Sequence, residues 1–497
     1  MKSLRLASAR AAMPGRSYGT YVAVITLGGA ALRLAFLGSS PLWRDEAFTA
    51  LAVRQSLGPM LHVVAHDSAP PLSYVLQHLI FSVWNRTAGL RLLSALAGTA
   101  AIPIGAALGR RIGGSRVGVW CALIFAVFPS LVLESRDARS YALATTMVLA
   151  ATLAVWRLVE HPTRGRTIVF GLCTTAALYT NYFALFAAVG QLIAIVLVFH
   201  VDRRRLLLAG AAVATAMLLL VPWLIYAHAQ FNHGSEPFWV AGVGFSTLSG
   251  VIVQFFGGPS IDAGISGALT LQTLQGVAVV IGAVGVMSLL ARRHRLAEPT
   301  RRSCAFLALC SLGALSLLVL ISAWHPLVEA RYASVVWGPL VCLVAVGFSE
   351  VARPAIAPLG ILVMAVIATV LSFALTEPDT PALTQVINGH VGPHDLVITS
   401  PAAYLLVLEY GDAAVRRQTH IVSNDVPWYW GTALFPRDAV LKRYPSPDGH
   451  LGTIYYIDVP GQPAARQPPK VERLLKPRRC YGTICLSTYA RSATADR

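Results

Sequence analysis

The sequence places four short groups of charged and polar residues next to the ends of long apolar runs. A carboxylate can accept a proton from a hydroxyl or bind a divalent metal ion, and an arginine fork matches the oxygens of a phosphate. The groups are Arg44-Asp45-Glu46, His66-Asp67, the run "ESRDARSY" from Glu134 to Tyr141, and the run "HPLVEARY" from His325 to Tyr332. If these groups meet, they can bind an anionic substrate and activate a hydroxyl.

The first two groups also have simpler explanations. Asp45 and Glu46 precede a predicted amphipathic helix on the membrane surface, Ala47 to Leu57, and would lie in its first turn. Carboxylates at that position interact favourably with the helix dipole and can remain solvated. His66-Asp67 can equally belong to a polar loop.

The other two groups are just as ambiguous when taken singly. The run 134–141 fits an interfacial anchor between two membrane spans. Arg331 and Glu329 fit a surface ion pair, which contributes little to stability. Surface ion pairs do not require four separate loops to converge, whereas a site for a lipid-linked anion does. We therefore expect the loops to form one site.

The composition is that of a polytopic membrane protein. Of the 497 residues, 55% are hydrophobic and only 13% are charged, whereas soluble domains average about 25% charged residues. Apolar runs near the length of roughly 20 residues that crosses a bilayer recur through residues 1–375. The first run follows a basic leader without a small-residue cleavage site, which indicates a retained anchor.

The net charge of +17 reflects membrane topology. Basic residues cluster at alternate ends of the apolar runs: at the N-terminus, at Arg110-Arg111-Arg116, at Arg157-Arg164-Arg166, at Arg203-Arg204-Arg205, between Arg292 and Arg302, and at Arg353. This is the positive-inside pattern, and it predicts a multi-pass protein of the cytoplasmic (inner) membrane with a cytoplasmic N-terminus. We expect the lipid bilayer as a partner and no nucleic acid.

With these clusters as cytoplasmic marks, eleven spans are predicted. They are 19–37, 90–109, 117–133, 141–158, two within 167–199, 206–226, one ending near 290, 304–323, 333–348 and 355–375. The segment Pro70 to Asn85 has 16 residues and begins with two prolines, so it predicts an interfacial or re-entrant helix within an outer loop, 38–89. The fold class expected for 1–375 is a polytopic α-helical membrane domain.

The tail, 376–497, has a different character. The runs "DLVITS" and "GTIYYIDV" predict strands and Ala402 to Tyr410 predicts a helix, so a small extracytoplasmic α/β domain is expected. Cys480 and Cys485 lie in this tail and are candidates for a disulfide. The other five cysteines lie in apolar runs and are expected to pack there.

Two classes of function are disfavoured by what the membrane domain lacks. Ionisable residues are scarce in the middles of the predicted spans, where ion-coupled transporters carry them. The chain shows no P-loop and no glycine-rich βαβ turn. We therefore expect no nucleotide cofactor and no nucleotide-sugar donor.

Over about residues 20 to 350 the chain resembles the GT-C glycosyltransferases, specifically the protein-O-mannosyltransferase and aminoarabinose-transferase-like group. The matching runs are "WRDEA", "PPLSYVL", "LRLLSALAGTAAIPIGAALGRRIGG", "SRDARSYAL", "YTNYFALF" and "EARYASVVWGP", in this order. The resemblance implies a GT-C-like fold and a sugar donor on a polyprenyl phosphate, used outside the cytoplasmic membrane with inversion at the anomeric carbon.

The resemblance also implies roles for individual residues. Asp45 would be the general base for the acceptor hydroxyl, and Glu46 would orient the acceptor or assist a metal ion, Mg²⁺ or Mn²⁺. Arg331 would bind the leaving lipid phosphate. The remaining candidates would bind the phosphate or a metal ion, position the substrate, or line the site: Arg136, Arg139, Asp137, His66, Asp67, Arg44, Tyr141, Tyr332 and Glu329.

One position departs from the pattern. Relatives often have a histidine directly before the double proline, where this chain has Ala69, and His66-Asp67 lie slightly earlier. The role of a histidine in this loop, and with it the need for a metal ion, is therefore open.

The expected function is transfer of a mannose or an arabinose-like sugar to a glycan, glycolipid or protein acceptor in the cell envelope. Two alternatives compete with it. A transporter or flippase of a lipid-linked glycan would need polar residues within the spans, and a non-catalytic assembly partner would tolerate loss of the Asp45 carboxylate.

Overall fold

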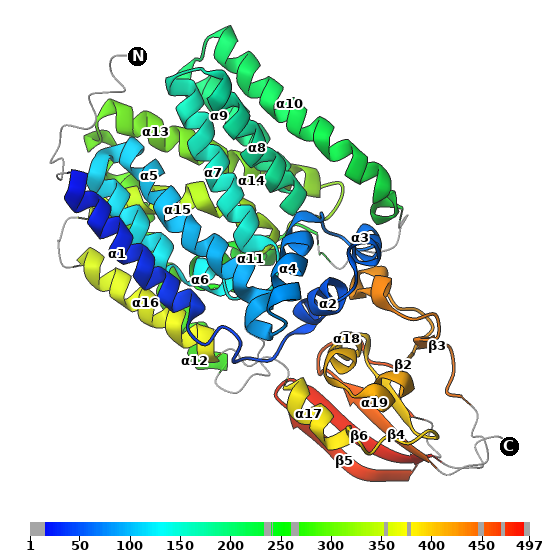
Figure 1. The fold of residues 1–497 in the computed structure, drawn as a ribbon. Coiled ribbons are helices and arrows are strands. Elements are labelled where there is room, and N and C mark those ends of the chain that lie inside the picture. Colours follow the sequence, from blue (N-terminus) through cyan, green and yellow to red (C-terminus); the bar gives the residue numbers. More distant parts are fainter. Residues whose placement is uncertain are drawn as a thin grey trace.

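The computed structural model describes residues 15–232, 240, 242–259, 268–351, 356–374, 379–445, 452–468 and 473–491. A helical bundle makes up the first three quarters of the chain, and a smaller domain with a six-stranded sheet lies against one end of it (Figure 1). The expected domain boundary at residues 375 and 376 falls outside the described residues. The fold class, a helical membrane protein with a small C-terminal sheet domain, is the one that the sequence predicts.

The long helices of the bundle are those expected of a membrane domain. They are α1 (Gly15–Leu34), α5 (Thr87–Val127), α7 (Tyr141–Glu160), α8 (Arg164–Thr180), α9 (Ala184–Phe199), α10 (Arg203–Tyr226), α12 (Ala268–Arg292), α13 (Glu298–Ala308), α14 (Ala314–Ser322), α15 (Trp337–Ser349) and α16 (Ile356–Ala374). A π-helical turn, η4 (Leu309–Gly313), joins α13 to α14, and a 3-10 turn, η5 (Tyr332–Val336), leads into α15. In the described part of the chain, seven helical segments are long and apolar enough to cross a membrane. The protein is therefore a multi-pass membrane protein, and the number of eleven spans stays a prediction.

The helix α5 contains two of the predicted spans because the chain reverses within it. Gly113 and Gly114 leave the helical conformation, and Gly114 has a φ of +81°, which favours glycine. The two halves then pack side by side: a Cβ on Gly109 would lie 2.4 Å from the Sγ of Cys121. A Cβ on Gly105 would lie 2.5 Å from the ring of Phe125. α5 is thus a helical hairpin whose close packing depends on glycines.

Shorter helices surround the end of the bundle that faces the sheet domain. They are α2 (Arg44–Val53), α3 (Leu57–Ala65), α4 (Leu72–Val83), α6 (Pro129–Glu134), η2 (His228–Phe231) and α11 (Phe245–Gly257). The segment Pro70 to Asn85 forms α4, whose 12 residues span about 18 Å at 1.5 Å per residue, too short for a bilayer core. It is a short helix, as its two prolines and length predict.

The helix expected over 47–57 differs from the prediction. It begins three residues earlier, at Arg44, and ends at Val53, and most of its side chains are buried. The reason is that α4 packs on one side of α2 and the sheet domain packs on another. α2 is therefore an interface helix rather than an amphipathic helix on the membrane surface.

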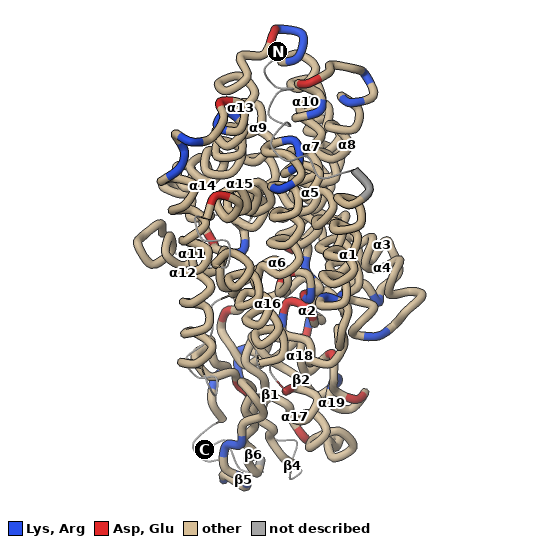
Figure 2. Tube along the Cα trace, turned by 90° about the vertical axis from the view of Figure 1, so that its left-hand side faces the viewer, with Lys and Arg blue, Asp and Glu red and all other residues tan. Residues whose placement is uncertain are grey.

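Arginine-rich turns lie at the ends of the bundle helices farthest from the sheet domain (Figure 2). Arg111, at the end of the first half of α5, pairs with Glu160 at the end of α7. Arg205, at the start of α10, donates to the carbonyl of Val159. These contacts bring three of the predicted arginine clusters to one end of the bundle. Part of a fourth cluster forms a short 3-10 turn, η3 (Arg293–Arg295), which follows α12. Arg353 falls outside the described residues.

The sheet domain contains β1 (Leu396–Thr399), β2 (Thr419–Val422), β3 (Val440–Leu441), β4 (Gly452–Asp458), β5 (Arg473–Tyr481) and β6 (Ile484–Arg491) in the order β3-β2-β1-β4-β6-β5. The pairs among β1 to β4 are parallel, and β6 runs antiparallel to β4 and β5. Its helical elements are α17 (Thr380–Ile387), α18 (Pro401–Tyr410), α19 (Ala413–Gln418), η6 (Trp428–Trp430) and η7 (Thr432–Leu434). β1, β4 and α18 occur where the sequence predicts them, and a disulfide joins Cys480 to Cys485 across the β5–β6 hairpin.

The close packing of the α5 hairpin makes a testable prediction. We expect Gly109→Ala to lower the stability by about 1–3 kcal/mol, because the added methyl group overpacks the contact with Cys121. Gly276→Ala, in α12, is the matched control: nothing lies within 4 Å of its Cβ, so helix propensity should leave stability unchanged or raise it by up to about 1 kcal/mol. Thermal unfolding of the detergent-solubilised protein measures both, and equal melting temperatures for the two variants would contradict the packing described.

Candidate active site

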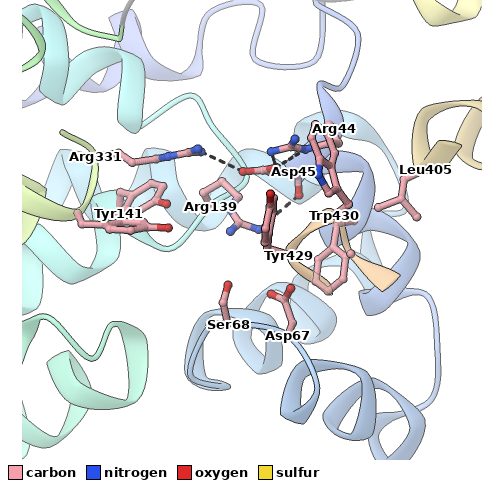
Figure 3. A pocket seen from close by; sticks show the side chains of 13 residues that line it. Arg44, Asp45, Asp67, Ser68, Arg139, Tyr141, Arg331, Leu405, Tyr429 and Trp430 are labelled. Atoms are coloured by element: carbon pink, nitrogen blue, oxygen red, sulfur yellow. Dashed lines mark hydrogen bonds and ion pairs between the residues drawn. The ribbon is translucent and has the colours of Figure 1, made fainter. Parts of the chain in front are cut away.

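A pocket opens where α2 and the surrounding loops of the bundle meet the sheet domain (Figure 3). Its lining combines three arginines, two aspartates and a set of aromatic side chains. The lining residues are Arg44, Asp45, Phe48, Asp67, Ser68, Arg139, Tyr141, Arg331, Tyr332, Leu405, Tyr429, Trp430 and Gly431. All four loop groups singled out in the sequence therefore contribute at least one residue to one site.

Asp45 is held between two guanidinium groups. Its Oδ1 accepts a hydrogen bond from the Nε of Arg44 at 2.9 Å, and its Oδ2 accepts one from Arg331 at 3.0 Å (Figure 3). Burial by itself would raise the pKa of Asp45, but the charges of Arg44, Arg139 and Arg331 outweigh burial and hold that pKa well below its ordinary value. The carboxylate is therefore anionic across the physiological pH range.

Arg139 and Asp67 form another part of the pocket. Arg139 is near enough to Tyr74 to donate to its hydroxyl at 3.3 Å, and its buried Nε has no hydrogen-bond partner among the described residues. A buried donor without a partner is costly, so a substrate oxygen would stabilise it. Asp67 is buried, and burial raises its pKa although the nearby charge of Arg139 lowers it.

Asp137 lies behind the pocket and does not line it. Its Oδ1 accepts a hydrogen bond from the Nε1 of Trp43 at 3.0 Å, and the ring of Trp43 lies under the guanidinium of Arg331, 5.8 Å from its Cζ. Burial, together with the charges of Glu46 and Glu134, raises the pKa of Asp137 well above its ordinary value. In this geometry Asp137 supports Trp43 and, through it, Arg331.

Glu46 also points away from the pocket, into the protein. Its carboxylate pairs with Arg91 of α5, with distances of 2.6 Å to Nε and 2.5 Å to Nη2. It also accepts a hydrogen bond from the backbone N–H of Ala138 at 2.8 Å. Arg91 in turn donates to the carbonyls of Leu37 and Pro41. This buried network joins the loop before α2, the loop after α6 and α5.

Three more of the predicted site residues lie outside the lining. Arg136 donates to the carbonyls of Leu32, Arg33 and Ala35, so it caps the end of α1. His66 is exposed, and its Nδ1 lies 2.8 Å from the carbonyl of His62. Glu329 is partly buried, which raises its pKa against the opposing charge of Arg331.

The sequence reasoning missed the contribution of the sheet domain. Leu405 from α18, and Tyr429, Trp430 and Gly431 from the turn after β2, reach the pocket. The run "VPWYWG" was the available signal, because three aromatic residues within a polar tail are unusual. Its distance along the chain from Asp45 prevented any assignment. Phe48 and Ser68, next to predicted groups, were also missed.

Glu134 is the first residue of the run 134–141, and the sequence predicts no separate role for it. It lies at the end of α6, and burial raises its pKa to about 7, against the lowering effect of the Arg331 charge. Its Oε1 is 3.5 Å from the side-chain amide of Gln254. Glu134 is thus an additional, half-buried carboxyl group near enough to Arg331 to interact with its charge.

The side chains of the pocket do not fit a divalent metal ion. Within the described residues, no group of three or more His, Cys, Asp or Glu side chains is placed to hold one. The pocket brings Arg44, Arg139 and Arg331 around Asp45, and three guanidinium groups repel a cation where Mg²⁺ or Mn²⁺ would need oxygen ligands.

Part of the sequence matches a known protein family, and the fold matches that of solved structures. Residues 68–226 match the family described as dolichyl-phosphate-mannose-protein mannosyltransferase. Among solved structures, ArnT from Cupriavidus metallidurans in the apo state matches with a TM-score of 0.65 at 12% identity, over 96% of this chain and 99% of that chain. The same protein bound to undecaprenyl phosphate gives 0.60 at 13% identity, over 97% and 99%.

A more distant match has the same fold. The Archaeoglobus fulgidus oligosaccharyltransferase, in complex with Zn and sulfate, gives a TM-score of 0.54 at 12% identity over 88% of this chain and 68% of that chain. Comparison with curated protein sequences finds no significant match. The chain therefore shares the fold of ArnT and of this oligosaccharyltransferase, and about a third of it matches the mannosyltransferase family model.

The position of Glu46 makes a prediction that separates a structural role from a catalytic one. We expect Glu46→Ala to destabilise the protein by about 3–5 kcal/mol, because it leaves Arg91 buried without its counter-charge. Glu298→Ala is the matched control, since it breaks an exposed pair with Arg302 that is worth at most about 1 kcal/mol.

Yield of monodisperse protein and thermal unfolding measure this effect. A Glu46→Ala variant with wild-type stability and no sugar transfer would instead support the role in catalysis that the family resemblance implies for Glu46.

Proposed function

We propose that this protein transfers a sugar, with inversion, from a polyprenyl-phosphate donor to a hydroxyl of an extracytoplasmic acceptor. The observation that carries the proposal is the half-buried Asp45 carboxylate, set between Arg44 and Arg331 in a pocket at the edge of the membrane domain. A general base and a phosphate-binding cation are the two groups that such a transfer needs, and here they touch one another.

On this proposal the arginines act on the donor. Arg331 and Arg139 bind the phosphate, and the buried Nε of Arg139, which lacks a partner among the described residues, supplies one of the hydrogen bonds. As the bond between the anomeric carbon and the phosphate oxygen breaks, its electron pair goes to the phosphate. Fixed positive charge stabilises that developing negative charge without reorganisation.

Asp45 acts on the acceptor. The acceptor oxygen attacks the anomeric carbon on the face opposite the departing phosphate, which inverts the configuration, and its proton goes to the Asp45 carboxylate. The low pKa of Asp45 keeps the base ionised before the reaction. A positioned general base contributes about 10²–10⁴-fold to the rate.

The location of the site follows from the charge pattern. Arginine-rich turns lie at the helix ends opposite the sheet domain, and by the positive-inside rule these ends face the cytoplasm. The pocket and the sheet domain then face the outside of the cytoplasmic membrane. A polyprenyl-phosphate donor fits this side, because nucleotide sugars are cytoplasmic and the chain carries no nucleotide-binding motif.

For the sugar, the match to the mannosyltransferase family over residues 68–226 favours mannose, and the likeness to ArnT keeps an arabinose-like sugar as the second candidate. The acceptor is a glycan, a glycolipid or a protein of the cell envelope. Lipid-linked sugar that accumulates in a deletion strain, and the glycan that disappears, would identify both.

Asp45→Asn tests the proposed base. We expect the variant to fold and to lose about 10²–10⁴-fold in transfer rate, because an amide has the shape of the carboxylate and cannot accept the proton. The assay uses purified protein with a polyprenyl-phosphate sugar. Asp425→Asn, an exposed aspartate of the sheet domain, is the control and should retain full activity. An active Asp45→Asn enzyme would rule out the assignment of the base.

The charge of the pocket leads to a second prediction. We propose that the guanidinium groups neutralise the donor phosphate without a divalent cation, so EDTA should leave the rate of transfer within about twofold of its original value, since charged hydrogen bonds of about 1.5–3 kcal/mol each already hold the phosphate. Activity assays after chelation, and after addition of Mg²⁺ or Mn²⁺, measure the effect. Loss of activity on chelation, restored by one of these ions, would contradict it.

A further inference from the structure

The sheet domain contacts the chain just before and just after α2. Before the helix, the backbone N–H of Leu42 donates to the hydroxyl of Tyr410 at 2.8 Å. After the helix, Arg54 forms a two-point ion pair with the buried carboxylate of Glu409, 2.6 Å from Nη2 to Oε1. Asp45 lies between these two attachments, so its helix is part of the interface between the two domains.

The turn from η6 to η7 makes a third contact, close to the pocket. Gly431 has a φ of +79°, and a Cβ there would lie 2.8 Å from Leu405 and 2.9 Å from the ring of Phe48 in α2. Only glycine lets the turn approach α2 this closely. The close approach places Trp430, which is 6% exposed, beside the start of α2.

Trp430 contacts Arg44 directly (Figure 3). The Cζ of Arg44 lies 4.4 Å from the centroid of the Trp430 ring, which is a favourable cation–π distance. The Nε of the same guanidinium donates to Oδ1 of Asp45. Arg44 is thus fixed between an indole ring from the sheet domain and the carboxylate from the bundle.

Both oxygens of the proposed base accept a hydrogen bond from an arginine. Oδ2 of Asp45 is bonded to Arg331, on the side assigned above to the donor phosphate, and Oδ1 is bonded to Arg44. The cavity in front of them has a volume of about 50 Å³, which admits a few water molecules. Each carboxylate oxygen has two lone pairs, so an acceptor hydroxyl can donate to Oδ1 beside the Arg44 N–H.

We propose that Trp430 is a positioning residue: it holds Arg44 on Oδ1 of Asp45, so that the sheet domain fixes the orientation of the base toward the acceptor. The inference rests on the proposed transferase function. The acceptor hydroxyl donates to the remaining lone pair of Oδ1 and gives its proton to that oxygen, while Trp430 keeps the Arg44 guanidinium, and with it the carboxylate, in place.

Several other groups face Asp45, and their charges bear on its titration. They are Asp67 from the loop after α3, Tyr74 from α4, Arg139 and Tyr141 from the connection between α6 and α7, Arg331 and Tyr332 at the start of η5, and Tyr429 from η6. None of these residues is substituted in the variants below, so a change in the titration of Asp45 reports the position of Arg44.

Trp430→Ala tests the inference through acceptor kinetics and their pH dependence. Without the ring, Arg44 leaves Oδ1 for part of the time, and we expect kcat/KM for the acceptor to fall about 10- to 100-fold with the KM for the donor unchanged. The pKa of Asp45 rises as it loses this cation, so the acid limb of the pH profile should move to higher pH. Arg44→Gln should give the same displacement.

Two variants serve as controls. Trp430→Phe keeps an aromatic face for the cation and should restore most of the activity and the original acid limb. Trp428→Ala removes a neighbouring tryptophan that does not line the pocket and should leave both unchanged. Equal losses in Trp428→Ala and Trp430→Ala, or a Trp430→Ala enzyme with the wild-type profile, would overturn the inference.

A measurement without turnover separates this inference from the proposed function. The infrared carboxylate signal that is absent from Asp45→Asn reports the protonation of Asp45, and its midpoint should rise in Trp430→Ala and Arg44→Gln but not in Trp428→Ala. If the wild-type protein transferred no sugar, the proposed function would fail, yet this midpoint would still decide the role of Trp430. An unchanged midpoint in Trp430→Ala would refute that role.

Discussion

The buried ion pair between Glu46 and Arg91 is the interaction on which the site depends. Asp45 and Glu46 are adjacent on α2, so their side chains point about 100° apart around the helix axis. Glu46 turns into the protein, where Arg91 and the N–H of Ala138 satisfy its carboxylate. That pairing fixes the rotation of α2, and the rotation leaves Asp45 facing the arginines. The two neighbouring carboxylates thus have different surroundings, because the helix directs one into the protein and the other into the pocket.

The membrane explains why these loops meet at one level. Each bundle helix satisfies its own backbone hydrogen bonds and can sit in lipid, so charged loops gather where the helices end. α2, the loop after α6 and the start of η5 reach that level from distant parts of the sequence, and Asp45, Arg139 and Arg331 come together there. The sheet domain then covers the site, which withdraws it from bulk water and strengthens the interactions among its charges.

Much of this could be predicted from the sequence, for physical reasons. The length of each apolar run and the positions of the arginines are set by the thickness and the sidedness of the bilayer. The bundle helices, the short α4 and the separate sheet domain could therefore be expected. The pocket members Arg44, Asp45, Asp67, Arg139 and Arg331 were found because charged residues at helix ends are conspicuous. The sequence could not predict the direction in which each side chain points. Arg136 caps α1 and Asp137 supports Trp43, whereas Arg139, close to both in the sequence, lines the pocket. Trp430 was not predicted because its partner Arg44 is remote along the chain, and the spacing of residue types within a segment does not indicate contacts between distant segments.

The pocket contains more positive than negative side chains, and these come from several parts of the bundle. Three guanidinium groups face two carboxyl groups, Asp45 and Asp67, and burial raises the pKa of Asp67, so the site carries excess positive charge before any substrate binds. Such an excess is tolerable only next to an anion or in partial contact with water, and a donor phosphate would supply the missing negative charge. If phosphate bound Arg139 and Arg331, these cations would interact less strongly with Asp45, and the carboxylate would become more basic. Donor binding would in this way prepare the base for the acceptor, while Arg44, held by Trp430, would keep the carboxylate oriented.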